Sequence, residues 1–184
     1  MILSAYWVSR SALWLRGQVR FMKLKESLPV RPVRRTPPVH LSAALGGLLT
    51  RNYDQRVELV ESTRTIAELL ITDPDVPLGC VRDFRYRTAL ARAWSAACGW
   101  LQAFESLAEE DRGMLERLGY TTATFRQRHA WLDQVVRRTV RAPALEPFAV
   151  DAVQASRQGV DAMIGELERL EQMLVSAAAS PYRS

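Results

Sequence analysis

Residues 90–104, LARAWSAACGWLQAF, carry the clearest pattern in the chain. The apolar residues within this stretch alternate steps of four and three: Leu90, Trp94, Ala97, Leu101 and Phe104. Such spacing lines up apolar side chains along one side of an α-helix and is typical of a helix buried against others. We therefore predict a long helix over residues 82–109 that turns this side toward a core.

Weaker versions of the same pattern precede this helix. We predict a short helix or helical hairpin over residues 41–53, weakened by Gly46 and Gly47. A separate helix is expected from Asp54 to about Ile71, where Asp73-Pro74 follows, because a residue before proline avoids the α conformation. The apolar residues expected to face the core are Leu41, Leu45, Leu48, Leu49, Val57, Val60, Ile66, Leu69 and Leu70.

Two further helices follow the central one. Gly113 and Gly119 predict a kinked or broken stretch, after which Thr122 is a suitable N-cap for a helix to about Arg141. The last helix is predicted over residues 148–178. Inward-facing residues are expected to be Phe125, Leu132, Val135, Val136 and Val140, and then Val153, Val160, Met163, Ile164, Leu167, Leu170 and Leu174.

No segment shows the alternating pattern of a β-strand bounded by turns. The chain has 184 residues, of which 48% are hydrophobic, a size and composition that fit one globular domain. We predict an all-α fold in which residues 41–184 form a bundle of about four main helices.

Residues 1–28 are predicted to form an amphipathic, basic helix, called the arm below. Its apolar side is expected to bind a partner protein or to pack on the bundle, and it consists of Trp7, Val8, Trp14, Leu15, Phe21 and Met22. The opposite side carries Arg16, Arg20 and Lys23.

Residues 29–40 cannot continue that helix, because four prolines remove amide donors and favour an extended polyproline conformation. We predict a basic linker that carries Arg31, Arg34 and Arg35. Residues 29–34, PVRPVR, also match the P-x-x-P-x-Arg form that SH3 domains bind, although a plain spacer explains them as well.

The charge is unevenly distributed. Residues 1–40 contain eight basic residues and one acidic residue, a formal charge of +7, whereas the rest of the chain has 17 basic and 19 acidic residues, a charge of −2. A basic segment before a near-neutral body indicates an anionic partner.

Further arginines are candidates for contacts with phosphate. Arg137, Arg138 and Arg141 end one predicted helix, where they also meet the negative end of the helix dipole. Arg82, Arg85 and Arg92 occur along the central helix. Together with the arm and linker cations, these residues form a phosphate-binding track only if the fold brings them together.

The chain lacks the residue patterns on which most familiar enzymes depend. The chain has neither glycine-rich nucleotide-binding motif, and its two histidines, His40 and His129, do not occur in the Glu-x-x-His pairs of di-metal bundles. The two cysteines, Cys80 and Cys98, are expected to be a loop thiol and a small core residue. We predict no catalytic residue, no nucleophile with a base, no metal or cofactor, and no small-molecule substrate.

Three functions stay open at this point. The first is a non-enzymatic interaction protein, a subunit of a larger assembly that docks other protein subunits through its arm, because the arm adds apolar surface that a bundle does not need. Trp100 and Tyr86, which lie off the predicted apolar side of their helix, are expected to add to that surface. The alternatives are a subunit that binds nucleic-acid phosphates without sequence preference and a peripheral protein whose first helix lies on an anionic membrane.

The expected location is intracellular and reducing, either the cytoplasm or, given the Arg-rich and acid-poor start, the mitochondrial matrix. No apolar run approaches the roughly 20 residues that cross a bilayer.

Overall fold

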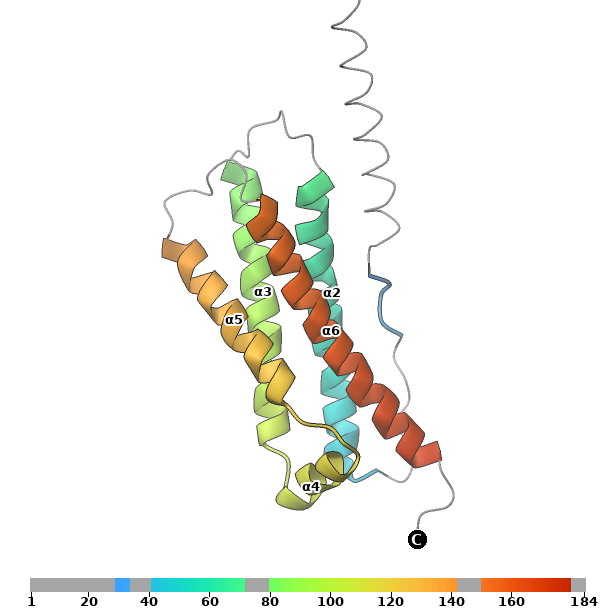
Figure 1. The fold of residues 1–184 in the computed structure, drawn as a ribbon. Helices are drawn as coiled ribbons and strands as arrows, with labels where there is room; N and C mark the ends of the chain where they lie inside the picture. Colours follow the sequence, from blue (N-terminus) through green and yellow to red (C-terminus); the bar gives the residue numbers. More distant parts are fainter. Residues whose placement is uncertain (1–28, 34–40, 72–79, 142–149, 180–184) are drawn as a thin grey trace, which may run out of the picture.

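The computed structural model describes residues 29–33, 41–71, 80–141 and 150–179, and these ranges contain five α-helices and no strand. The helices are α2 (Ala43–Ile71), α3 (Cys80–Glu105), α4 (Glu109–Arg117), α5 (Ala123–Arg141) and α6 (Val150–Ala179). The four long helices run alternately up and down, and the short α4 lies at one end of the bundle (Figure 1). This arrangement confirms the predicted all-α bundle. The predicted helix over residues 1–28 lies outside the described residues.

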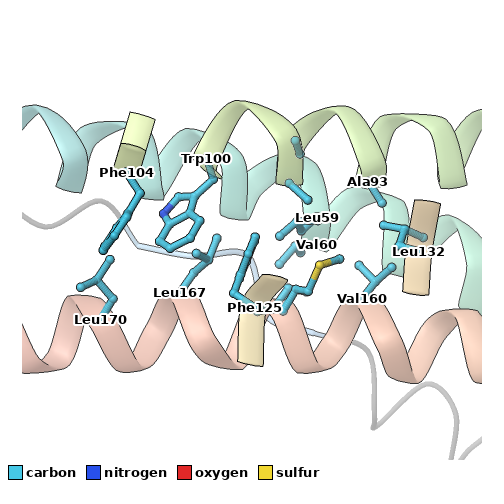
Figure 2. Packing of buried hydrophobic residues seen from close by; sticks show 14 of the residues in the cluster. Leu59, Val60, Ala93, Trp100, Phe104, Phe125, Leu132, Val160, Leu167 and Leu170 are labelled. Carbon is cyan, nitrogen blue, oxygen red and sulfur yellow. The ribbon is translucent and has the colours of Figure 1, made fainter. Parts of the chain in front are cut away.

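The four long helices form a ring in which each helix packs mainly against two others. Helix α2 packs against α3 and α6, and α5 packs against the same two helices from the other side. Apolar side chains from all four helices meet in the middle, as Figure 2 shows for Val60, Trp100, Phe125 and Leu167. Burying each large apolar side chain contributes about 1.5–3 kcal/mol, so this shared core is the main source of stability.

An aromatic cluster fills the end of the core near α4. The ring of Trp100 is fully buried, and its centroid lies 4.3 Å from that of Phe125, 5.5 Å from Phe104 and 6.4 Å from Tyr120. Tyr120 belongs to the turn between α4 and α5, so this cluster joins the turn to the bundle.

The prediction of two helices over residues 41–71 is wrong, because α2 is continuous. It begins after Ser42, whose Oγ accepts a hydrogen bond from the amide of Leu45 at 3.1 Å, as an N-cap does. Gly46 and Gly47 cost about 1 kcal/mol each relative to alanine. The burial of Leu45 and its neighbours on the same side of the helix offsets that cost.

The predicted helix over residues 82–109 is shorter than expected. Helix α3 ends at Glu105, and Leu107, which follows it, is buried in the core and anchors the turn into α4. Helix α4 then ends in a Schellman motif at Gly119, which has a φ of +83°. The amide of Tyr120 donates to the Leu115 carbonyl at 2.9 Å, and both side chains are buried.

Three predictions of burial are also wrong. Trp100 and Tyr86 were expected to add exposed apolar surface, yet both are buried. Helix α3 contacts α2, α5 and α6, so it buries a wider arc than a single apolar stripe suggests. Val140 was expected to face the core but is 71% exposed, because it lies in the last turn of α5, where the α3 residue in contact is Arg87.

Candidate functional site

Most of the residues predicted to bind a partner precede the bundle. The apolar side of the arm, Arg16, Arg20 and Lys23, and the linker residues Arg34 and Arg35 all lie outside the described residues. Of the predicted binding residues, the structure therefore places Arg31 in the linker and three arginines at the end of α5.

The linker residues 29–33 are unevenly buried. Pro32 is buried and Pro29 is half-buried, whereas Val30 and Val33 are 87% and 75% exposed. This alternation has the three-residue period of a polyproline helix. An SH3 domain needs both prolines of the motif. The burial of Pro32 therefore disfavours SH3 binding and leaves the valines and Arg31 facing outward.

The arginines at the end of α5 differ in their surroundings. The Nε of Arg137 donates to Asp133 Oδ2 at 2.8 Å, so its charge is neutralised locally. Arg138 and Arg141 are exposed and form no ion pair within the described part of the chain. These two side chains are thus available for anions.

Two of the three α3 arginines of the predicted phosphate track pair with carboxylates of α2, and the side chain of Arg82 lies outside the described residues. Arg85 pairs with Glu68 at 2.9 Å and Arg92 with Glu58 at 2.8 Å, both across to α2. These arginines consequently face the opposite side of α3 from α5.

A thiol and an imidazole meet between α3 and α5, an arrangement that the sequence did not predict. Cys98 Sγ lies 3.1 Å from His129 Nε2, and the Trp94 ring stacks on the imidazole with a centroid distance of 6.4 Å and an interplanar angle of 21°. The expectation that no nucleophile has a base beside it is therefore wrong as a matter of geometry.

The electrostatics of this pair favour its uncharged form. Burial raises the pKa of the Cys98 thiol, and the carboxylate of Asp133 raises it further. Burial lowers the pKa of His129, an effect that Asp133 partly opposes. Both shifts work against a thiolate–imidazolium pair, the reactive form of a catalytic cysteine.

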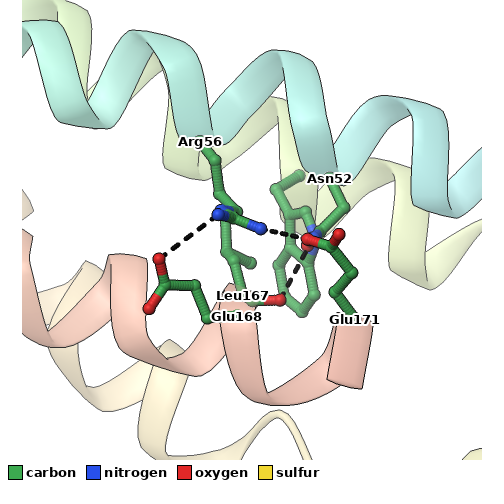
Figure 3. Close-up of polar contacts among 6 residues, drawn as sticks. Asn52, Arg56, Leu167, Glu168 and Glu171 are labelled. Atoms are coloured by element: carbon green, nitrogen blue, oxygen red, sulfur yellow. Dashed lines mark hydrogen bonds and ion pairs between the residues drawn. The ribbon is translucent and has the colours of Figure 1, made fainter. Parts of the chain in front are cut away.

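A second polar cluster lies within the core and joins three helices (Figure 3). Asn52 of α2 accepts a hydrogen bond from Trp100 Nε1 and donates one to the Leu167 carbonyl, each at 3.1 Å. One turn later, Arg56 pairs with Glu171 and, at 3.2 Å, with Glu168. Because Asn52, Arg56 and Glu171 are buried, this cluster aligns α2, α3 and α6 and does not face a ligand.

Within the described ranges, no group of three or more His, Cys, Asp or Glu side chains is arranged to hold a metal ion. None of the described helices combines the length and apolar character that crossing a membrane requires.

Comparisons with protein-family models, with curated proteins and with solved structures found no match to this chain.

Proposed function

We propose that this chain is a non-enzymatic helical interaction protein, a subunit of a larger assembly that docks through its N-terminal arm. In this proposal the bundle is a rigid platform. The arm and the exposed side of the linker present apolar and basic groups to another protein.

The observation that supports this proposal most is how the described residues distribute their apolar surface. The bundle buries its own large side chains, including Trp100, Tyr120 and Phe125. Of the large apolar residues that stay exposed in the described ranges, Val30 and Val33 are the two most exposed, and both lie in the linker next to the arm. The two most exposed apolar side chains of the described ranges therefore lie in the segment that directly follows the arm, whose predicted apolar side contributes six more large apolar residues.

The neutral state favoured at Cys98 and His129 supports a packing role for that pair. Trp100 and Tyr86 no longer support the proposal, since both belong to the core.

The test compares tagged full-length chains in cells that express the protein naturally. We expect the unaltered chain to elute from size exclusion of a native extract as part of a larger complex. The variant Trp7→Ser/Trp14→Ser/Phe21→Ser is expected to elute at the mass of the free chain, because it loses the apolar side of the arm.

A matched control, Arg16→Gln/Arg20→Gln/Lys23→Gln, alters the opposite side of the same segment. It should stay in the complex. Loss of the complex only in this control, together with sensitivity to nuclease, would indicate nucleic-acid binding instead. An unchanged elution of the apolar variant would contradict the proposal.

A further inference from the structure

Two large apolar side chains are exposed where the start of α3 meets the end of α5. Phe84 of α3 is 69% exposed and Val140 of α5 is 71% exposed. Arg87, one turn after Phe84, donates a hydrogen bond to the carbonyl of Thr139, the residue before Val140. Phe84 and Val140 therefore flank one contact between the two helices.

The helix geometry places both side chains on the same outer face. Residues two apart are about 200° apart around an α-helix, so Phe84 points away from the core that buries Tyr86. Val140 follows His129 by eleven residues, which is about three turns, and His129 contacts α3 through Cys98. Val140 consequently lies along the edge of α5 that borders α3.

Arg141, the residue after Val140, adds one positive charge beside these side chains. Asp83 pairs with Arg87 at 2.8 Å, and Asp133 pairs with Arg137 at the same distance. Arg141 is exposed and has no ion-pair partner in the described ranges. We call Phe84, Val140 and Arg141 the α3–α5 patch.

We propose that the α3–α5 patch docks on the surface of an anionic lipid bilayer. Exposed apolar side chains beside an arginine suit the boundary between acyl chains and acidic headgroups, where a cation adds to the attraction. The arm of this chain is not expected to bind the α3–α5 patch, because the arm and Arg141 are both positively charged.

A partner helix fits the patch less well than a lipid surface does. A docking helix needs a groove between two helices. Between the start of α3 and the end of α5, Arg87 fills that space and bonds to the Thr139 carbonyl. Two exposed apolar side chains are also few for a stable protein interface, which buries about 800 Å² on each partner. A bilayer sets no such minimum, because membrane binding increases with the apolar area buried and with the attraction to anionic lipid.

The test uses the full chain and sedimentation with vesicles of phosphatidylcholine, with or without about one third phosphatidylglycerol. We expect binding to the anionic vesicles that weakens as salt is raised. Phe84→Ser/Val140→Ser should lower the partition coefficient about tenfold, and Arg141→Gln about threefold to fivefold. Because these side chains are exposed, the thermal unfolding midpoint should not change.

The matched control is Arg117→Gln/Leu118→Ser, which alters one arginine and one partly exposed leucine at the end of α4, on the opposite end of the bundle. Its binding should equal that of the unaltered chain. Failure of the unaltered chain to bind anionic vesicles, or equal binding by the Phe84→Ser/Val140→Ser variant, would overturn the proposal. Binding to heparin but not to vesicles would do the same and would indicate another polyanion.

This proposal does not depend on the proposed function of the arm. The patch substitutions are repeated in the Trp7→Ser/Trp14→Ser/Phe21→Ser background. They should still lower the remaining vesicle binding, whereas an effect that disappears in this background would contradict a separate docking site.

Discussion

At the scale of single residues, Gly159 of α6 leaves room for the side chain of Trp131 of α5. A Cβ at this position would lie 2.2 Å from Trp131 Cζ3, well inside van der Waals contact. The indole of Trp131 therefore rests directly on the backbone of α6, a packing that only glycine permits.

We expect Gly159→Ala to lower the free energy of unfolding by about 1–3 kcal/mol, because the indole ring must move away. Gly165→Ala is the matched control on the same helix, since no atom lies within 4 Å of its Cβ position. It should raise stability by about 0.5–1 kcal/mol through helix propensity. Urea unfolding followed by circular dichroism measures both, and equal shifts for the two variants would contradict this account of Trp131.

His129 is expected to make stability depend on pH. Its folded-state pKa lies below the ordinary value of 6.5, chiefly because of burial, so the unfolded chain takes up a proton first as the pH falls. The free energy of unfolding should therefore decrease as the pH is lowered through and below about 6.5, and level off below the folded-state pKa.

The measurement is urea unfolding between about pH 5 and pH 8, a window that spans the ordinary histidine pKa. His129→Gln removes the titrating group but keeps a polar side chain, so its stability should vary less with pH than that of the unaltered chain. A difference between the two chains that stays constant across the window would show that His129 does not titrate in this way.

Contacts between side chains of different helices could mostly not be predicted from the sequence. Cys98 and His129 are 31 residues apart, and their contact depends on how far α3 and α5 slide along each other. Hydrophobic spacing does not report that displacement. Trp100 was assigned to the wrong surface for a related reason, because spacing along one helix does not reveal on how many sides it has neighbours.

At the scale of secondary-structure elements, α2 and α6 are aligned by buried charge as well as by apolar packing. Arg56 and Glu171 are both buried, and Arg56 also pairs with Glu168. A buried ion pair contributes little compared with an apolar pair, yet removing one partner leaves a costly unpaired charge.

We expect Arg56→Met to lower the free energy of unfolding, by at most about 3–5 kcal/mol, because Glu171 then loses its buried ion pair with Arg56. The double variant Arg56→Met/Glu171→Met should recover most of that loss, since two apolar side chains then replace the ion pair. Chemical denaturation of the single and double variants forms the test. A double variant that is less stable than Arg56→Met alone would mean that the pair itself stabilises the contact.

Element boundaries were partly predictable. The helix predicted from Thr122 is α5, and the last predicted helix is α6 within two residues at each end. The break expected near Asp54 does not occur. Local cues at Gly46, Gly47 and Asp54 weaken a helix, but they do not measure the core contacts of Leu45 and Leu59, which keep α2 continuous.

At the scale of the whole molecule, the described bundle has its own core, and we expect it to fold without the arm. All four long helices contribute to one buried cluster, and α4 closes one end of it through Leu115. The fold class followed from hydrophobic spacing alone. The function did not, because hydrophobic spacing does not tell whether the arm contacts a partner or its own bundle.

The free energy of unfolding of the full chain, compared with that of residues 29–184, tests the central claim most directly. If the apolar side of the arm is kept for a partner, the two values should agree within about 0.5 kcal/mol, the usual range for changes away from a core. A loss of several kcal/mol in the shorter chain would contradict the account. It would show that Trp7, Trp14 and Phe21 are buried against their own bundle, where each contributes about 1.5–3 kcal/mol.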